Sequence, residues 1–362
     1  MCIRDSYNII VATAILSMVS CTDWETAEAE IFDKSMTEVV KSEEYYENLR
    51  AYKKSDHSIA FGWYSEWEEG SADTGNTLSA VPDSMDMISL WNNSRNLSPK
   101  KKADLEFVQK VKGTKVLQCT FVQYIGKGVT PAEYDTDEAT RNAYWGWNPN
   151  PADKKENLPA IEKYAKAFAD TIKAYGYDGL DIDFEPNVDG VSGPLDEDPV
   201  YVAMLFKEFS KYFGPKSGSG LIFCVDGEIE RIPEGTETYF DYFIQQAYMN
   251  HSSNGLRSRF ETSYRSIGRG MSKAEFAKKY IITENLESAI DCLNGGYKWE
   301  NFPLDVKPSL VGYADLDLGE GLRKGGFGAY RFSNERANNP KFKWMRKAIQ
   351  EQNPSPGYQT ID

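Results

Sequence analysis

One short stretch, residues 177–186 (Tyr-Asp-Gly-Leu-Asp-Ile-Asp-Phe-Glu-Pro), constrains the fold of this chain more than any other. Its residues alternate between carboxyls and large apolar groups, with Asp181, Asp183 and Glu185 interleaved by Leu180, Ile182 and Phe184. Successive side chains of a β-strand point to opposite faces, so the stretch predicts a strand with one acidic and one apolar wall. Carboxylates this close repel one another, and we expect at least one to hold a proton at neutral pH. Pro186 interrupts strand hydrogen bonding, which places Glu185 at the C-terminal end.

Strand-like and helical segments alternate along the rest of the chain. Apolar runs typical of strands occupy residues 58–64, 85–91, 115–124, 221–225, 239–249, 280–284 and 326–332. Helices are predicted over residues 100–111, 158–175, 200–213 and 341–351. The strand runs are mostly continuous in apolar residues, as expected when both faces of a sheet are covered. With the acidic stretch as the fourth strand, this order predicts an α/β fold, a single (β/α)8 TIM barrel, in which chemistry sits at the strands' C-terminal ends. A doubly wound open sheet is the alternative.

Composition narrows the function classes. The 362 residues include 41 Lys plus Arg and 55 Asp plus Glu, a net charge of −14, which would repel nucleic acid. The two histidines, His57 and His251, argue against a histidine metal site and a Ser-His-Asp triad. The five cysteines show no spacing typical of zinc or of a disulfide framework. No glycine-rich nucleotide loop precedes a helix. We therefore expect no metal, no cofactor and no nucleic-acid partner.

The acidic strand also carries a motif. The pattern Asp178-Gly-x-Asp181-x-Asp183-x-Glu185 resembles the signature of glycoside hydrolase family 18, and the strand order resembles that family over most of the chain after Ser55. The resemblance implies retaining hydrolysis of a β-linkage at N-acetylglucosamine, with the substrate's own acetamide as nucleophile. The alternatives are an acidic strand without function and a divalent metal site, although one straight strand presents carboxyls along a line and not around an ion.

The resemblance also implies a role for each carboxyl. Glu185 would protonate the glycosidic oxygen and later deprotonate water, and the two carboxyls beneath it would raise its pKa as that task requires. Asp183 would orient the acetamide N–H and stabilise the positive oxazolinium intermediate. Asp181 would share a proton with Asp183, so that the group titrates as a coupled set. Asp178 and Gly179 are expected to shape the entry to the strand.

A second match lies in the sixth predicted strand, where alternation places Gln246, Tyr248 and Asn250 on one face. Tyr248 resembles the family's conserved hydroxyl, which hydrogen-bonds the acetamide oxygen. Family chitinases usually have Met-x-Tyr-Asp here, whereas Gln-x-Tyr is similar to the endo-β-N-acetylglucosaminidases that cut between the two core GlcNAc residues of N-glycans. Tyr330 stands where chitinases often have a Trp, and residues 284–325 are too few for the inserted module of many chitinases. Chitinase and a non-catalytic glycan-binding barrel are the alternatives.

Further contacts to an N-glycan, or another GlcNAc-containing glycan, are predicted near strand ends and in the loop after the third strand. The aromatic candidates have core or loop packing as their alternative. The polar candidates would bond sugar hydroxyls. The set is Trp63, Tyr64, Trp145, Trp147, Asn187, Asp226, Glu228 and Glu284.

The N-terminus is predicted to be an export signal. Residues 7–19 are apolar, too few to span a bilayer but typical of a signal peptide, and an ordinary buried helix is the alternative. Met-Val-Ser-Cys21 resembles a loose bacterial lipobox, and the acidic run after it resembles the surface-export signal of Bacteroidetes lipoproteins. We expect a lipoprotein signal peptide over 1–21, lipidation at Cys21, a tether with one helix over 22–54 and a catalytic domain over 55–362. The enzyme would be a monomer, lipid-anchored at the outer membrane and touching the membrane only through that anchor.

Overall fold

A computed structural model describes residues 41–70, 76–92, 94–250, 252–297, 299 and 307–355. The chain separates into two compact units, Met1–Tyr45 and Tyr46–Asp362. The predicted signal peptide, Cys21 and the first part of the tether lie outside the described residues. None of the helices in the described ranges is long and apolar enough to cross a membrane.

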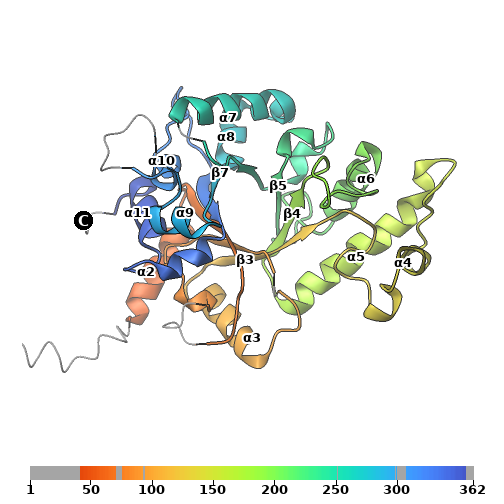
Figure 1. Cartoon of the computed structure of the whole chain (residues 1–362), viewed down its shortest axis with the longest axis horizontal. Helices are drawn as coiled ribbons and strands as arrows, with labels where there is room; N and C mark the ends of the chain where they lie inside the picture. The colour runs from red at the N-terminus through yellow and green to blue at the C-terminus, as the bar shows by residue number, and fades with distance from the viewer. Residues whose placement is uncertain are drawn as a thin grey trace, which may run out of the picture. The chain divides into compact units, whose positions relative to one another are not determined.

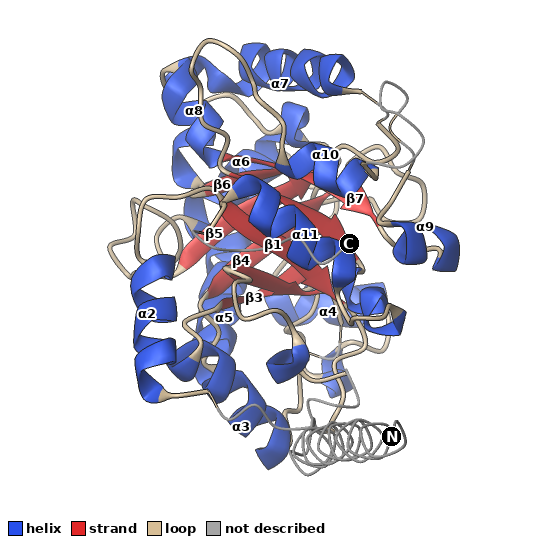
Figure 2. Ribbon diagram, turned by 90° about the vertical axis from the view of Figure 1, so that its left-hand side faces the viewer, coloured by secondary structure: helices blue, strands red, loops and turns tan. Residues whose placement is uncertain are grey.

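Eight parallel strands close into one barrel, each paired with its neighbours in chain order and the last with the first. Figure 2 shows the strands inside a layer of helices. The strands are β1 Ile59–Tyr64, β2 Met87–Leu90, β3 Lys115–Phe121, β4 Gly179–Phe184, β5 Ile222–Gly227, β6 Tyr242–Gln246, β7 Tyr280–Asn285 and β8 Gly326–Tyr330. The predicted (β/α)8 barrel is confirmed, with the acidic stretch as its fourth strand, and the open-sheet alternative is excluded by closure.

The helices follow the strands around the barrel (Figure 1). They are α2 Glu43–Lys53, α3 Pro99–Glu106, α4 Glu138–Trp145, α5 Leu158–Tyr175, α6 Pro199–Phe209, α7 Ser253–Ile267, α8 Lys273–Lys279, α9 Ala289–Asn294, α10 Ser309–Ala314 and α11 Lys343–Gln352. The bounds of α5 are those that its apolar period predicts. The sequence analysis did not predict α4, α7, α8, α9 and α10, which occupy intervals assigned to loops or to no element.

The sixth strand is shorter than predicted. It ends at Gln246 because the chain turns there: the Ala247 N–H donates to the Gln245 and Thr283 carbonyls, at 2.9 and 3.1 Å. Met249 then adopts a positive φ of 57°, which a strand does not accommodate. Tyr248 and Asn250 therefore lie on a turn beyond the strand.

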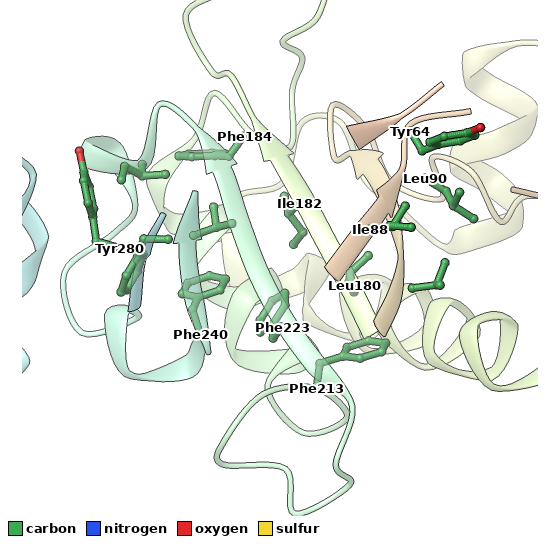
Figure 3. Packing of buried hydrophobic residues seen from close by; sticks show 14 of the residues in the cluster. Tyr64, Ile88, Leu90, Leu180, Ile182, Phe184, Phe213, Phe223, Phe240 and Tyr280 are labelled. Atoms are coloured by element: carbon green, nitrogen blue, oxygen red, sulfur yellow. The ribbon is translucent and has the colours of Figure 1, made fainter. Parts of the chain in front are cut away.

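The two faces of β4 separate as predicted. Leu180, Ile182 and Phe184 face outward and pack with aromatic side chains such as Phe213, Phe223 and Phe240 (Figure 3). The acidic side chains occupy the barrel interior, where β4 pairs with β5 in a register that sets Asp183 beside Asp226. Gly179 begins the strand where a Cβ would come within 2.2 Å of the Ile222 carbonyl oxygen, so only glycine fits this close strand approach.

The strand entry is fixed by Asp178. Its carboxylate accepts the backbone N–H of Val116 at 2.9 Å, Gln109 Nε2 at 2.8 Å and Lys115 Nζ at 2.9 Å. These bonds tie the start of β4 to β3, which confirms the structural role predicted for Asp178.

Candidate active site

The carboxyl row of β4 rises through the barrel interior to its C-terminal mouth. Asp181 and Asp183 are buried, with 0% and 2% of their surfaces exposed. Glu185 follows the last residue of the strand and is partly exposed. The row thus runs from buried interior to the mouth where barrel enzymes hold their substrates.

Asp181 is held as an acceptor. Its Oδ2 receives the Ser89 hydroxyl at 2.6 Å and the Trp63 indole N–H at 3.0 Å. Burial raises the pKa of Asp181 to about 6, while the bonds from Ser89 and Trp63 act in the opposite direction because they favour the ionised form. Trp63 is 1% exposed. It therefore supports Asp181 from below, which corrects the expectation that it stacks on a sugar.

Asp183 shares its surroundings with Asp226 and Gln246. Gln246 Nε2 donates to Asp226 Oδ1 at 2.9 Å and lies 3.4 Å from Asp183 Oδ1. Burial raises the pKa of both aspartates well above the usual value; the charge of Glu185 adds to this at Asp183, and the charges of Asp183 and Asp181 add to it at Asp226. Asp226 was expected past a strand end, bonding sugar hydroxyls. It lies instead within β5 and is fully buried.

Glu185 has the environment of a proton donor. Its pKa is raised first by burial and then by the charge of Glu228, whereas a hydrogen bond from Gln246 lowers it. The rise was predicted to come from the carboxyls beneath Glu185, whereas in the structure it comes from burial and the rim carboxylate Glu228. The Asn187 N–H and Nδ2 donate to Glu228 Oε2 at 3.1 and 2.8 Å, which joins the loops after β4 and β5. Beside them opens a polar cavity of about 540 Å³, lined by Glu185, Glu228, Arg231, Gln246 and Arg259 among others.

Tyr248 completes the group at the mouth. Burial and the charges of Asp226 and Asp183 raise its pKa well above the usual value, so it is a neutral hydroxyl. Its ring lies 6.2 Å from that of Tyr330, at an interplanar angle of 27°. Tyr330 is partly exposed at the end of β8. Both side chains stand at the mouth, and their contacts to a sugar stay a prediction.

Glu284 and Asn250, two polar residues predicted from the sequence to lie in the site, are at the turn that carries Tyr248. Glu284 is fully buried, and its Oε1 accepts the Met249 N–H at 3.0 Å. The Asn250 N–H donates to Tyr313 Oη at 3.1 Å, and that hydroxyl donates to the Ala247 carbonyl at 2.7 Å. Asn250 Oδ1 accepts the Ser252 N–H at 3.3 Å, at the start of α7. The prediction of a sugar contact is corrected for Glu284, because its buried side chain binds the backbone of the turn. A sugar contact of the partly exposed Asn250 stays a prediction.

The remaining aromatic candidates are packed away from the mouth. Tyr64 is fully buried on the outer face of β1, where its hydroxyl donates to the Thr77 carbonyl at 3.1 Å (Figure 3). Trp145 is 3% exposed and donates to Thr130 Oγ1 at 2.8 Å. Trp147 is 8% exposed, with its ring 4.7 Å from that of Tyr201. The predicted glycan contacts of these three side chains are corrected to core and loop packing.

A group of aromatic side chains at the mouth was not predicted from the sequence. Trp91 and Phe121, at the ends of β2 and β3, have ring centroids 5.3 Å apart, and Trp91 lies 5.5 Å from Tyr330. Met87, Ser89 and Trp91 are spaced two residues apart, so their side chains point to the same, inward face. This spacing is the sequence signal from which Trp91 could have been predicted to lie at the mouth.

Three buried side chains inside the barrel could supply ligand atoms to a metal ion. Cys119 Sγ, an Asp183 oxygen and an Asp226 oxygen lie within 4.8 Å of one another, all buried. Coordination would require ionised groups, whereas burial raises the pKa of each of the three well above its usual value. The Gln246 N–H also faces the same carboxylate oxygens, where its positive end would repel a cation. The set therefore fits protons better than a metal ion.

A (β/α)8 barrel with a protonatable carboxyl at its mouth, above buried carboxyls and beside aromatic rings, has the features of a glycoside hydrolase. Comparison with known proteins gives the family. Residues 22–351 match the description "Glycoside hydrolase family 18, BT1044-like", and the chain belongs to that family. It is accordingly a glycoside hydrolase.

Relatives and solved structures agree with this assignment. The chain is 28% identical over 260 residues to Endo-beta-N-acetylglucosaminidase F2 of Elizabethkingia meningoseptica. The aligned residues cover 69% of each protein. A solved BT1044 variant is 30% identical, with a TM-score of 0.71 over 86% of this chain and 93% of that one. An endo-beta-N-acetylglucosaminidase from Cordyceps militaris, solved with fucosyl-N-acetylglucosamine-Asn, is 20% identical, with a TM-score of 0.59 over 87% and 97%. A chitinase from Pseudoalteromonas aurantia shares the fold at 15% identity, with a TM-score of 0.51 over 81% and 100%.

Proposed function

We propose that the protein is an endo-β-N-acetylglucosaminidase that cleaves the β-1,4 bond of the N,N′-diacetylchitobiose core of N-glycans. The observation that carries the proposal is the contact of Gln246 with Asp183 and Asp226, beside Tyr248. Gln246 stands where the Met-x-Tyr-Asp of chitinases has Met. The similarity to Endo-beta-N-acetylglucosaminidase F2 supports the same activity.

The proposed mechanism uses the acetamide of the substrate as nucleophile. Its carbonyl oxygen forms a bond to the anomeric carbon while the glycosidic C–O bond breaks, and Glu185 gives its proton to the leaving oxygen. Asp183 accepts the acetamide N–H and stabilises the positive oxazolinium ion, while the Tyr248 hydroxyl donates to the acetamide oxygen. Glu185 then takes a proton from water as that water attacks the anomeric carbon and the bond from this carbon to the acetamide oxygen breaks. Two displacements at one carbon give retained configuration.

The position of the cut tests this function. On a purified N-glycoprotein, we expect mass spectrometry to find a single GlcNAc left on Asn and a released glycan ending in one GlcNAc. The wild-type protein is compared with Glu185→Gln, which keeps the shape of the acid but has no proton to give. Chitin oligomers serve as the parallel substrate. Turnover of the oligomers with none of the glycoprotein would assign a chitinase, and glycan binding without turnover would assign a binding protein.

We further propose that the mature protein is a monomer, lipid-anchored through Cys21 at the outer membrane of a bacterial cell. The apolar stretch before Cys21 and the family match starting at residue 22 support a signal ahead of the enzyme. In a bacterial host that processes lipoproteins, radiolabelled palmitate is expected to enter the wild type but not Cys21→Ala. Equal labelling of the two would refute the anchor, and elution of the labelled protein in detergent at the mass of a dimer would refute the monomer.

A further inference from the structure

We propose that Asp226, on β5, is the proton partner of Asp183 and thereby a positioning residue of this site. In the resting site one proton would be shared between the two carboxyls. When substrate binds, that proton would stay on Asp226, whose O–H then donates a hydrogen bond to Asp183, and Asp183 carries the negative charge. The catalytic part of this inference rests on the proposed function, whereas the location of the proton does not.

Strand register makes Asp226 the nearer partner. Asp183 and Asp226 are directly paired residues of neighbouring parallel strands, with side chains on the same interior face. Adjacent strands lie about 4.8 Å apart, whereas residues two apart on one strand are separated by about 6.6 Å. Asp181 is therefore farther along the strand from Asp183 than Asp226 is across the sheet. A side-chain hydrogen bond joins Asp183 to Asp226, while Asp181 acts on Asp183 only through its charge. Asp226 also hydrogen-bonds to Asp181 and there favours the ionised form of Asp181.

The hydrogen-bond donors lead to the same assignment. Asp181 Oδ2 already receives two donors, Ser89 and Trp63, which favour its ionised form, although its buried Oδ1 receives no N–H or hydroxyl from the described residues. Asp226 Oδ1 receives Gln246, but Asp226 Oδ2 is buried and receives no N–H or hydroxyl from the described residues. A buried carboxylate oxygen without a donor is costly. A proton on Asp226 Oδ2, directed at Asp183, removes that cost.

The charges around Asp226 favour a retained proton. The acids that face it are Asp181 and Asp183 of β4, and Glu185, beyond the end of that strand, acts on Asp183. Cys119 faces it from β3 and Tyr248 from the turn after β6, and burial keeps both neutral by raising their pKa values. No cation among the described residues is in contact with this cluster. With one proton shared, two negative charges remain on three buried carboxyls, instead of three.

The catalytic benefit is that Asp183 need not lose its proton to solvent. As the acetamide N–H arrives, the shared proton moves onto Asp226, so its bond to Asp183 lengthens to an ordinary hydrogen bond and no proton is gained or lost. Asp183 is then an anion with two donors, the acetamide N–H and the Asp226 O–H. It can stabilise the developing positive charge without becoming a buried carboxylate that lacks partners.

Asn at position 226 imitates the protonated aspartate. In Asp226→Asn, Oδ1 can still accept from Gln246 while Nδ2 donates permanently to Asp183. We expect kcat on the glycoprotein to stay within about tenfold of the wild type, while the acidic limb of its pH profile moves down by about one pH unit or more, because Asp183 no longer binds a proton. In Asp226→Ala the donor is lost, and kcat is expected to fall by about 10- to 100-fold.

Infrared difference spectroscopy tests the proton itself, without turnover. At mildly alkaline pH, the protonated-carboxyl band of the resting protein is expected to weaken in Asp226→Asn and to persist in Asp181→Asn, the matched control on β4. Thermal unfolding of each variant shows that it is folded. An unchanged band in Asp226→Asn, a band lost in Asp181→Asn, or a pH profile of Asp226→Asn parallel to the wild type would overturn the assignment. So would loss of wild-type activity with a chelator and its recovery with a divalent cation. A wild type without glycosidase activity would refute the proposed function, and the spectra would still decide where the proton lies.

Discussion

Glu185→Gln is expected to lower kcat by about 10²- to 10⁴-fold, the range that general acid–base catalysis contributes. The glutamine keeps the shape of the side chain and its bond to Gln246, but it can neither protonate the leaving oxygen nor take a proton from water. Glu185 is partly exposed at the mouth, so the substitution leaves the buried interior intact. The measurement is the initial rate of glycan release, with the thermal unfolding midpoint as the test of folding.

The control for this prediction is Glu228→Gln, a neighbouring carboxyl of the same rim. Its charge raises the pKa of Glu185 above the ordinary value, so removing the charge should lower that pKa. Because the acid form of Glu185 starts the reaction, activity declines as pH rises through this pKa. The alkaline limb should therefore move to lower pH in Glu228→Gln, with far less loss at the optimum than in Glu185→Gln. Equal losses in the two variants would contradict the assignment of Glu185 as the acid.

Asp183→Asn is expected to lower kcat by about 10²- to 10³-fold, the effect of removing one preorganised group that stabilises charge in a transition state. The asparagine can still hydrogen-bond the acetamide, but it has no negative charge to oppose the oxazolinium ion. The loss should therefore appear in kcat with little change in KM, since the bound substrate is neutral before bond cleavage. Steady-state kinetics on a single glycopeptide measures both constants.

Asp178→Asn is the matched control within the same motif. Asp178 binds Val116, Gln109 and Lys115 at the entry to β4, on the far side of the barrel from the mouth. Its substitution should cost about 1–3 kcal/mol of unfolding free energy, because hydrogen bonds to a charged group are weakened, with kcat unchanged. A large fall in kcat for Asp178→Asn, or none for Asp183→Asn, would show that the motif acts through the fold and not through its charge.

The predictions that came from periodicity within one segment agree with the structure. Alternation along residues 177–186 placed Asp181 and Asp183 inside the barrel and Glu185 beyond the strand's end, because the period of a strand determines which face each side chain takes. The apolar period of α5 likewise gave its bounds. Such signals are local, so no knowledge of the neighbouring strands is needed to read them.

The errors concern residues whose environment depends on other segments. Asp226 and Ser89 meet Asp181 and Asp183 only through strand register, which one segment does not reveal. Trp145 ends α4, and Trp147 follows that helix. Their indoles are covered where exposure was expected, because Trp145 packs on Thr130 and Trp147 on Tyr201 of α6. Glu284 follows the apolar run at residues 280–283, and its side chain binds the Met249 N–H in the turn of Tyr248. That turn depends on the positive φ of Met249, which the sequence does not predict.

The apolar outward face of the acidic strand compensates for the stability that the barrel loses through its acidic interior. Branched aliphatic side chains usually fill that space in such barrels. Here Leu117, Ile244 and Ile281 fill only part of it, and Asp181, Asp183 and Asp226 occupy another part without favourable apolar burial. Directly behind them, the outer layer is dense in aromatic rings, with Phe184 against Phe206 and Phe223 against Phe240 at 5.6 and 4.5 Å. The two faces of the sheet thus serve different ends. The inner face carries the acidic groups and loses apolar packing, and the aromatic packing of the outer face compensates for this loss of stability.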